Sequence, residues 1–531
     1  MRHIFAIMLA ALFLFYPSQG FTQVKEIVSE GAYNMGDGET PSVAESRALL
    51  NAKRIALEQA GTYVESYTKV ENLELTKDEI QVLTSGIMKV EILDKKRTIV
   101  GDGFRFWVKI KARVNPDRIQ EMAKKVKEKS VIEDYKKIQE AYDKSQREIE
   151  ELKKQLAQAK DEKEKKQIEA KISDAERMFQ ANEWFEKGLQ YDLNKKYDEA
   201  IEAYTSAIAL NPNLAEAYTN RGNAYADKGQ HDRAIEDFNK AIALNPNDAG
   251  YYYNRGNAYY DKGQYDRAIE DYNKAISINS NLAEAYTFRG AAYADKGQHD
   301  RAIEDYNEAI SINPNLAGAY TNRGAAYADK GQYDMAIEDY NRAIALNPNL
   351  AEAYHNRGNV YGNKGQYDMA IEDYNKAIAL NPNYAQAYTN RGAAYAGKGQ
   401  YDMAIEDYNK AIALNPNDAD AYINRGNAYD DKGQYDRAIE DFNKAISINP
   451  NDAGYYYNRG NAYFKKGQYD MAIEDFNRAI ALNPNDALAY NNRGLAYSEK
   501  GIMSKAISDF QKACDMGNEY GCKNLQEALP R

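Results

Sequence analysis

From Ala181 to near the end of the chain, small and aromatic residues return every 34 positions. Numbering each 34-residue unit from 1, position 8 is always Gly, position 11 Tyr, and positions 20 and 27 Ala. Position 4 is Tyr or Trp, and position 24 is Tyr or Phe. Positions 4, 8 and 11 share one face of a helix, and positions 20, 24 and 27 share one face of a second helix. The pattern therefore predicts ten helical hairpins. The units start at Ala181, Ala215, Ala249, Ala283, Ala317, Ala351, Ala385, Ala419, Ala453 and Ala487.

The polar positions of the unit predict where its helices begin and end. Gly at position 15 ends the first helix, and an Asn-Pro-Asn segment ends the second in most units. Ser280 replaces the Pro in one unit, and the last unit lacks it. Asp at position 18 lies where the second helix needs an N-cap, which contributes roughly 1 kcal/mol per unit. Gly at position 8 lets the second helix approach closely, and the Ala residues fill the crossing.

These positions resemble the signature of the tetratricopeptide repeat (TPR) over residues 181–520. The resemblance implies a mainly α fold, a right-handed α-solenoid of ten hairpins with a concave inner groove. Position 7 departs from the family pattern, because it is Arg rather than apolar in units 2 to 10, and position 23 is Asp in the same units. A guanidinium on a packing face needs a partner. We therefore expect structural ion pairs, within or between units, such as Arg221 with Asp237, Arg357 with Asp373, and Arg493 with Asp509.

By the same resemblance, positions 2, 5, 9, 12 and 13 of the first helix line the groove. Asn recurs at position 9 and Asp at position 13, and units 3 and 9 add aromatic residues. An Asn amide can donate to and accept from a peptide backbone. The candidate groove residues are Asn223, Asp227, Tyr253, Asn257, Tyr260, Asp261, Asp295, Asp329, Asn359, Asn427, Asp431, Tyr457, Asn461 and Phe464.

The charges of this groove indicate the kind of segment it would bind. Family members that bind a chaperone's C-terminal carboxylate use Lys and Arg, whereas positions 5 and 9 here carry neither. We expect an extended neutral or basic polypeptide. The alternative is that Asn and Asp only solvate a helix surface.

The segment before the array divides into two regions. Residues 23–115 predict a small α/β domain, with helical spacing from Val43 to Val64, a strand from Gly86 to Val100, and period-two alternation from Phe104 to Val114 after a Gly-Asp-Gly turn. Together with Glu30-Gly31-Ala32 and the run Ala44–Ala60, this resembles the N-terminal domain of flagellar assembly protein T and related envelope proteins. No catalytic or metal-binding residue is implied.

Residues 117–180 predict a charged helical connector. Ile138, Ile149, Leu152, Leu156, Ile168, Ile172 and Met178 have spacings of three, four and seven among many charged residues. Two readings stay open: a coiled coil, which would make a homodimer, and a helix or helical hairpin acting as a spacer.

Both ends of the chain indicate export. Residues 1–20 are typical of a secretory signal. They contain Arg2, the uncharged run Ile4 to Tyr16, Pro17 and small residues up to Gly20. The alternative is an uncleaved anchor, although the run is shorter than the roughly 20 residues of a membrane span. The only two cysteines, Cys514 and Cys522, would pair in an oxidising compartment, with two reduced thiols as the alternative. Their surroundings resemble the cysteine-bearing turn of Sel1-like repeats, which implies that a disulfide joins the last hairpin to a capping helix in residues 521–531.

Composition narrows the function. A net charge of −11 argues against nucleic acid or an anionic membrane as the main ligand. The four His residues have no triad or metal spacing, and no phosphate-binding loop is present. We expect no cofactor, no metal and no catalysis. The sequence predicts a periplasmic or cell-surface bacterial scaffold for other proteins or, as the alternative, an envelope assembly factor docked through its N-terminal domain.

Overall fold

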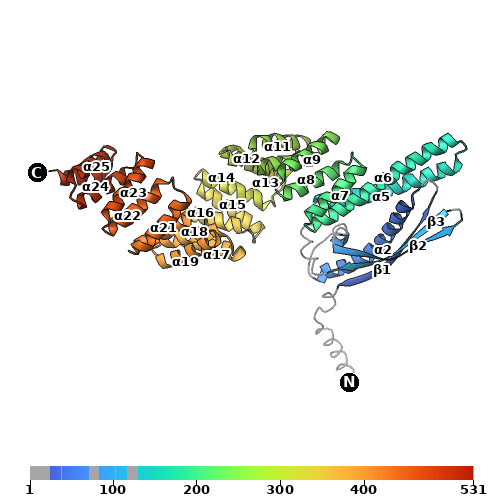
Figure 1. The fold of residues 1–531 in the computed structure, drawn as a ribbon, viewed down its shortest axis with the longest axis horizontal. Helices are drawn as coiled ribbons and strands as arrows, with labels where there is room; N and C mark the ends of the chain where they lie inside the picture. Colours follow the sequence, from blue (N-terminus) through green and yellow to red (C-terminus); the bar gives the residue numbers. More distant parts are fainter. Residues whose placement is uncertain are drawn as a thin grey trace, which may run out of the picture. The chain divides into compact units, whose positions relative to one another are not determined.

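The computed structural model describes residues 24–36, 39–70, 80, 83–85, 87–101, 103–115 and 129–529 (Figure 1). The predicted signal, residues 1–20, lies outside these residues. The chain forms two compact bodies that divide after Ser280, the position at which Ser replaces the recurring Pro. The first body contains the sheet, the connector and three hairpins, and the second contains the remaining hairpins.

A three-stranded antiparallel sheet, in the order β1-β3-β2, packs against one helix. Its elements are β1 (Lys25–Met35), α2 (Pro41–Val70), β2 (Met88–Val100) and β3 (Gly103–Val114). Alternate residues of β3, from Phe106 to Val114, are buried under α2, as the period-two pattern predicts. The sequence reasoning did not identify β1, which pairs with β3 along its whole length. Gly31 lies in β1 where α2 crosses it, and a Cβ there would be 2.2 Å from the carbonyl oxygen of Ala48. This glycine therefore allows the helix to rest on the strand.

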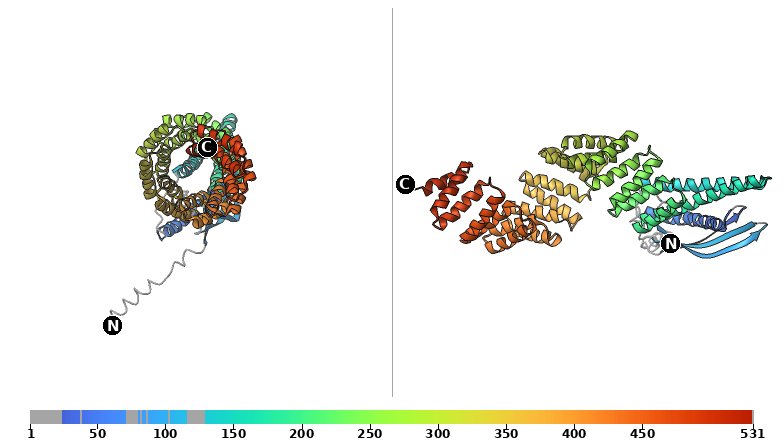
Figure 2. Two further views of the ribbon diagram at one scale, coloured as in Figure 1. Left: turned by 90° about the vertical axis from the view of Figure 1, so that its left-hand side faces the viewer. Right: turned by 45° about the horizontal axis from the view of Figure 1, so that its top comes forward.

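The connector is a helical hairpin, one of the two readings that the sequence left open. Its helices are α5 (Lys129–Gln158) and α6 (Glu162–Leu193), which lie antiparallel (Figure 2). Leu152 and Leu156 of α5 pack on Ile168 and Ile172 of α6, so the apolar seam is used within the chain. Asp161 caps α6 by accepting from the amide of Lys163. Since no helix-breaking residue intervenes, α6 continues through Ala181, and the boundary placed between connector and array does not interrupt the helix.

A buried polar cluster joins the sheet domain to the connector. The Arg47 and Glu39 side chains are fully buried with 3.5 Å between Nη1 and Oε1, and Lys153 of α5 reaches Glu39 at 2.6 Å. Arg47 also donates to the hydroxyl of Tyr33 at 2.7 Å. Because a buried charge is costly without its partner, this cluster fixes the domain against the hairpin.

Ten helical hairpins follow the pattern found in the sequence. The first consists of the end of α6 and α7 (Tyr197–Leu210). The first helices of the next units are α8 (Ala215–Asp227), α10 (Ala249–Asp261), α12 (Ala283–Asp295), α14 (Ala317–Asp329), α16 (Ala351–Asn363), α18 (Ala385–Gly397), α20 (Ala419–Asp431), α22 (Ala453–Lys465) and α24 (Ala487–Glu499). Their second helices are α9 (His231–Leu244), α11 (Tyr265–Ile278), α13 (His299–Ile312), α15 (Tyr333–Leu346), α17 (Tyr367–Leu380), α19 (Tyr401–Leu414), α21 (Tyr435–Ile448), α23 (Tyr469–Leu482) and α25 (Met503–Asp515).

Each hairpin closes around the glycine at position 8. In unit 6, a Cβ on Gly358 would lie 2.8 Å from Cε1 of the Tyr374 ring, and the other units have the same close approach. Tyr374 and the flanking Ala370 and Ala377 are buried, as expected for positions 24, 20 and 27. The absence of a side chain at position 8 therefore makes room for the ring at position 24.

The turn of each hairpin confirms one prediction and contradicts another. Gly229 and its counterparts at position 15 have positive φ, which ends the first helix. Asp at position 18 is not the N-cap: helices such as α17 begin one residue earlier, after Gln366, which makes no side-chain capping bond. Asp334 instead accepts from Lys364, at position 14 of the next unit, with a distance of 2.6 Å. The side chain points outward from the first turn, where Lys364 of the stacked neighbour is its partner.

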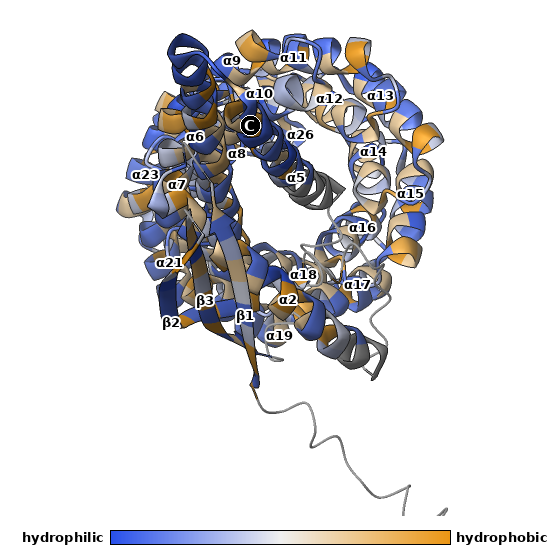
Figure 3. Cartoon of the chain, turned by 90° about the vertical axis from the view of Figure 1, so that its right-hand side faces the viewer, coloured by the Kyte–Doolittle hydropathy of each residue, from blue (hydrophilic) through white to orange (hydrophobic). Residues whose placement is uncertain are grey.

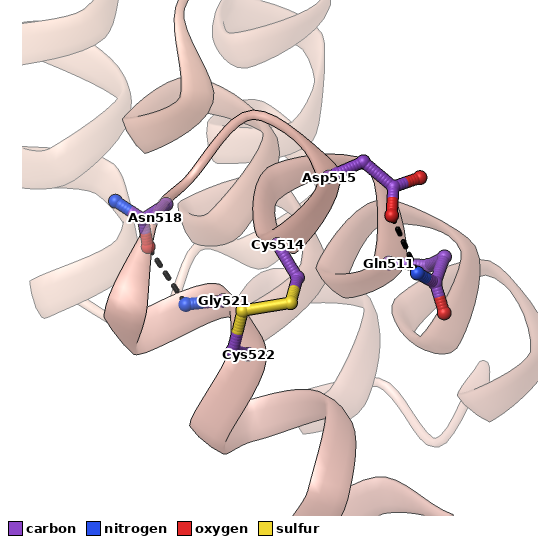
Figure 4. The surroundings of a disulfide bond; sticks show 6 residues. All are labelled: Gln511, Cys514, Asp515, Asn518, Gly521 and Cys522. Carbon is purple, nitrogen blue, oxygen red and sulfur yellow. Dashed lines mark hydrogen bonds between the residues drawn. A yellow bond between two sulfur atoms is a disulfide. The ribbon is translucent and has the colours of Figure 1, made fainter.

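At the C-terminal end, Cys514 and Cys522 form a disulfide (Figure 4). It joins α25 to α26 (Glu519–Ala528), the capping helix, whose predicted extent was 521–531. Asn518 caps α26 by accepting from the amide of Gly521 at 2.7 Å. The resemblance of this turn to Sel1-like repeats stays a prediction.

Candidate functional site

In units 2 to 10, an ion pair between the two helices of the hairpin holds the first helix in place. In unit 2, Nε and Nη2 of Arg221 donate to the two carboxylate oxygens of Asp237, each at 2.7 Å. The pair lies within the unit, and the remaining nitrogen, Nη1, donates to Thr205 of the unit before. Pairing with Asp237 keeps the pKa of Arg221 above its ordinary value. Arg357 with Asp373 and Arg493 with Asp509 have the same geometry.

The Asn side chains at position 9 are partly committed to the protein itself. Asn257 and Asn359 each accept a hydrogen bond at 2.8 Å from the Tyr hydroxyl at position 24 of their own unit. Asn461 accepts at 2.8 Å from Asn492, at position 6 of the next unit. Asn223 and Asn427 belong to units with Phe at position 24, which has no hydroxyl. Where the side-chain carbonyl of the Asn already accepts a hydrogen bond, its side-chain NH2 group remains, and this group can only donate.

The Asp residues at position 13 lie at the end of the first helix, beside the preceding unit. Burial and the charge of Asp227 raise the pKa of Tyr197, with which Asp227 also makes a side-chain hydrogen bond. Asp261 and Asp329 have carboxylate oxygens 3.8 Å from Nδ1 of the preceding His231 and His299. Asp295 and Asp431 are exposed at the same position. These acids therefore mark an edge where hairpin turns stack.

The four candidate aromatic residues are half-buried and pack in two equivalent ways. Tyr253 and Tyr457, at position 5, contact the ring at position 24 of their own unit, with centroids 6.1 and 6.0 Å apart. Tyr260 and Phe464, at position 12, contact the ring at position 17, with centroids 5.5 Å apart in both units. Each ring is therefore partly exposed. Figure 3 shows hydrophilic and hydrophobic residues alternating along the helices of the array.

One cavity brings three of the predicted residues together. It holds about 330 Å³ within the second body, and Asn427, Asn461 and Phe464 line it. The remaining lining residues are Asp430, Phe442, Asn458, Lys465, Asn492 and Leu495. Three successive first helices, α20, α22 and α24, supply most of this wall, so an extended segment crossing them would meet amide groups at regular intervals.

Sequence reasoning missed the charged pair in this cavity. Asp430 and Lys465 are 2.5 Å apart, and the Asp430 side chain is 15% exposed. Its second oxygen, Oδ1, is buried without a hydrogen-bond partner in the described chain. A buried acceptor without a donor favours a ligand that brings one, such as a Lys, an Arg or a peptide amide. Asp430 occupies position 12, where Ala is the most common residue, present in four of the ten units, and that departure was the available signal.

A second cluster that the sequence reasoning set aside surrounds His355 at position 5. Nε2 of this buried ring lies 3.1 Å from the amide nitrogen of Asn390, and Nδ1 lies 3.1 Å from the hydroxyl of Tyr384. Asn390 also donates to Asn359 at 2.8 Å. Burial lowers the pKa of His355. The cluster links units 6 and 7 on the predicted groove face.

No group of three or more His, Cys, Asp or Glu in the described part of the chain is placed to hold a metal ion. Among the same residues, no helix combines the length and the apolar character that crossing a membrane requires.

Sequence models of the tetratricopeptide repeat match the array without a gap from residue 188 to residue 516. The model described as TPR repeat matches residues 188–229, 222–263, 256–297, 290–331, 326–365, 426–467 and 460–501. Models described as tetratricopeptide repeat match residues 351–384, 385–418, 407–440 and 487–516.

Individual relatives share only parts of the chain. Hsp70-Hsp90 organizing protein 1 from Arabidopsis thaliana is 43% identical over 72 residues, which are 13% of this chain and 11% of that protein. A crystal structure of the protein MamA is 34% identical, covering 32% of this chain and 93% of its own, with a TM-score of 0.29. A crystal structure of YrrB, a TPR protein with an unusual peptide-binding site, is 27% identical, covering 35% of this chain and 96% of its own, with a TM-score of 0.31. The curated relative shares only about a tenth of its length with this chain.

Proposed function

The chain belongs to the tetratricopeptide repeat family, and from this premise we propose that it is an exported, non-enzymatic scaffold that binds extended neutral or basic segments of other proteins in its groove. The observation that carries the proposal is the cavity around Asn427, Asn461 and Asp430. There, Asp430 has a buried oxygen without a hydrogen-bond donor among the described residues, and amide groups line the path of a ligand. A basic side chain would complete this site, and the neighbouring amides would bind its backbone.

A peptide-display experiment tests this proposal. The purified protein is used to select from a library of random decapeptides, in parallel with an Asp430→Asn variant. We expect enrichment of Lys and Arg, flanked by small or apolar residues, and weaker enrichment by the variant. Selection of acidic C-termini would overturn the proposed specificity.

Asp402→Asn is the matched control for this experiment. This Asp pairs with Lys432 on the surface and lies outside the cavity. The control should select the same peptides as the unchanged protein. Equal loss in both variants would show that general charge, and not the cavity, determines binding.

Export is a separate part of the proposal. It is supported by the signal-like pattern of residues 1–20 and by the disulfide, which persists in oxidising compartments. Fusing residues 1–40 to a reporter that is active only after export should give activity in bacteria. Deleting Ile4–Tyr16 should abolish it, whereas an active deletion would contradict export through this segment.

A second candidate function is that of an envelope assembly factor. The cluster of Arg47, Glu39 and Lys153 supports it, because this cluster holds the sheet domain firmly on the connector as a docking module. Deleting residues 23–115 separates the two functions: an assembly factor would lose its cellular location, whereas a free scaffold would keep its partners.

A further inference from the structure

The sheet domain contains a cleft on the side that its helix leaves uncovered. α2 packs on β1 and β3 but meets β2 at few points. Met88, Val90 and Ile92 of β2 pair directly with Val114, Ala112 and Ile110 of β3, so they share the inner, apolar face of the sheet. Yet Ile92 is 40% exposed, whereas Ile110 is fully buried. The inner face of β2 is therefore an apolar surface without a covering element in the described chain.

The first helix of the array forms the opposite wall of this cleft. Together, α2, β2 and α6 enclose about 600 Å³, within the size range of binding pockets in proteins. Apolar side chains from α2 and β2 form its floor: Leu49, Leu50, Leu57, Met88, Val90 and Ile92. Gln190 and Tyr191 of α6, and Asn194 directly after it, supply polar groups. All these residues belong to the first body.

Cations surround the cleft, in contrast to the acidic chain as a whole. Its lining includes Lys53, Arg54, Lys89, Lys187 and Lys196, but only one acid, Glu186. That acid accepts a hydrogen bond from Tyr142 at 3.0 Å. Arg54 pairs with Asp143, and Lys196 pairs with Glu199. In the described part of the chain, no carboxylate lies within ion-pair distance of Lys53, Lys89 or Lys187. Lys53 and Lys187 do act electrostatically on the buried Glu183 outside the lining, and Lys187 lies over the Trp184 ring at 4.2 Å.

We propose that this cleft binds an extended acidic polypeptide segment whose apolar side chains cover the inner face of β2. The distribution of charge favours a polypeptide over a fatty acid. Its cations come from three separate elements, α2, β2 and α6, so one carboxylate head group could neutralise only part of the rim. A peptide with carboxylates on alternate residues can reach several cations while its apolar residues enter the floor.

This site is distinct from the groove of the array and has the opposite charge preference. In the described chain, the cavity at Asp430 has a buried oxygen without a hydrogen-bond donor, whereas the lining of the cleft at Lys89 carries five cations and one acid. The chain would thus bring an acidic partner to its N-terminal body and a neutral or basic partner to its array. The inference stands on the cleft alone and does not require the proposed function of the groove.

Binding of a defined peptide to the whole protein tests the inference. The probe is a fluorescein-labelled decapeptide of alternating Val and Glu, compared with the same peptide carrying Lys in place of Glu. We expect the acidic peptide to bind at least about tenfold more tightly than the basic one, and the affinity to fall as salt is raised. A Lys89→Glu/Lys187→Glu variant should lose at least about tenfold in affinity.

Matched variants separate the possible causes of a loss. Lys240→Glu/Lys444→Glu makes the same charge change on exposed faces of α9 and α21 and should bind like the unchanged protein. Ile92→Ser tests the apolar floor without reversing a charge and should also weaken binding. Asp430→Asn should not affect the acidic peptide, so a failure of the groove proposal is distinguishable from a failure here.

Two results would overturn the inference. One is equal affinity of the Lys89→Glu/Lys187→Glu variant and its charge-matched control while both melt at the temperature of the unchanged protein. The other is binding of lauric acid, measured by calorimetry, by a protein that does not bind the acidic peptide. That result would assign the cleft to an aliphatic anion instead.

Discussion

Arg357 and Asp373, sixteen residues apart on the two helices of one hairpin, are joined by two parallel hydrogen bonds of 2.8 and 2.6 Å. The Asp373 side chain is 5% exposed and the Arg357 side chain 18%. The third donor of Arg357 bonds to Asn341 in the preceding unit. One arginine therefore fixes both the geometry of its own hairpin and its stacking on the previous one.

Replacing Asp373 by Ala should destabilise the array, because it leaves a largely buried guanidinium without its carboxylate. The expected loss is about 3 kcal/mol in the hairpins around unit 6. Hydrogen exchange of α16 and α17 measures it directly, since repeat arrays open locally. Glu372→Ala removes an exposed acid at the adjacent position and is the control. Equal exchange rates in the two variants would contradict a stabilising role for the pair.

Sequence periodicity was sufficient to predict the hairpins, because each of the recurring positions is set by contacts within about one repeat. The glycine at position 8 and the ring at position 24, such as Gly358 and Tyr374, are 16 residues apart and meet in every unit. The partners of Asp at position 18 lie 30 residues away, in the next unit. A single-unit pattern does not contain that neighbour, so the N-cap prediction for this position was wrong.

Replacing Gly358 by Ala should lower the free energy of unfolding of its hairpin by about 1–3 kcal/mol, because the added Cβ would meet the Tyr374 ring at 2.8 Å. Gly318→Ala is the matched control. That glycine is also helical, yet a Cβ there has no other heavy atom within 4 Å. The control should be stabilised by about 0.5–1 kcal/mol, since Ala loses less conformational entropy than Gly. Thermal unfolding of both variants should therefore shift in opposite directions.

The candidate site was less predictable than the fold. Asn427, Asn461 and Phe464 were identified from recurring positions and do line one cavity. Asp430 and Lys465 were missed because each differs from the residue most common at its repeat position. A pattern built from recurring residues does not include such exceptions. The Tyr374 hydroxyl that donates to Asn359 comes from the second helix of the hairpin, so this hydrogen bond can be recognised only once both helices are placed.

Reducing the disulfide between Cys514 and Cys522 should loosen the capping helix. The bond spans eight positions, and closing a loop of this size contributes about 2.5 kcal/mol by chain entropy. Reduction, or a Cys522→Ser variant, should therefore increase hydrogen exchange in α26 and in the end of α25. Exchange in α16 should not change and serves as the internal control. No change in α26 would show that packing, rather than the disulfide, holds the cap.

Acid should weaken the array at units 6 and 7 through His355. Its pKa is lowered by burial, so the folded protein keeps the ring neutral while the unfolded chain protonates it. The unfolded state then binds more protons as pH falls below the ordinary histidine value of about 6.5, and stability is lost in that direction. The titratable groups that face the ring are the hydroxyls of Tyr374 and Tyr384, which stay protonated throughout this range.

A His355→Thr variant carries the residue most common at this position, and its melting temperature should fall less between pH 7.5 and pH 5.0 than that of the unchanged protein. Because both proteins contain the same carboxylates, the difference between the two falls isolates His355. Identical falls would mean that the ring is solvated or charged in the folded array, and the hydrogen bonds to Asn390 and Tyr384 would then have no role in stacking these units.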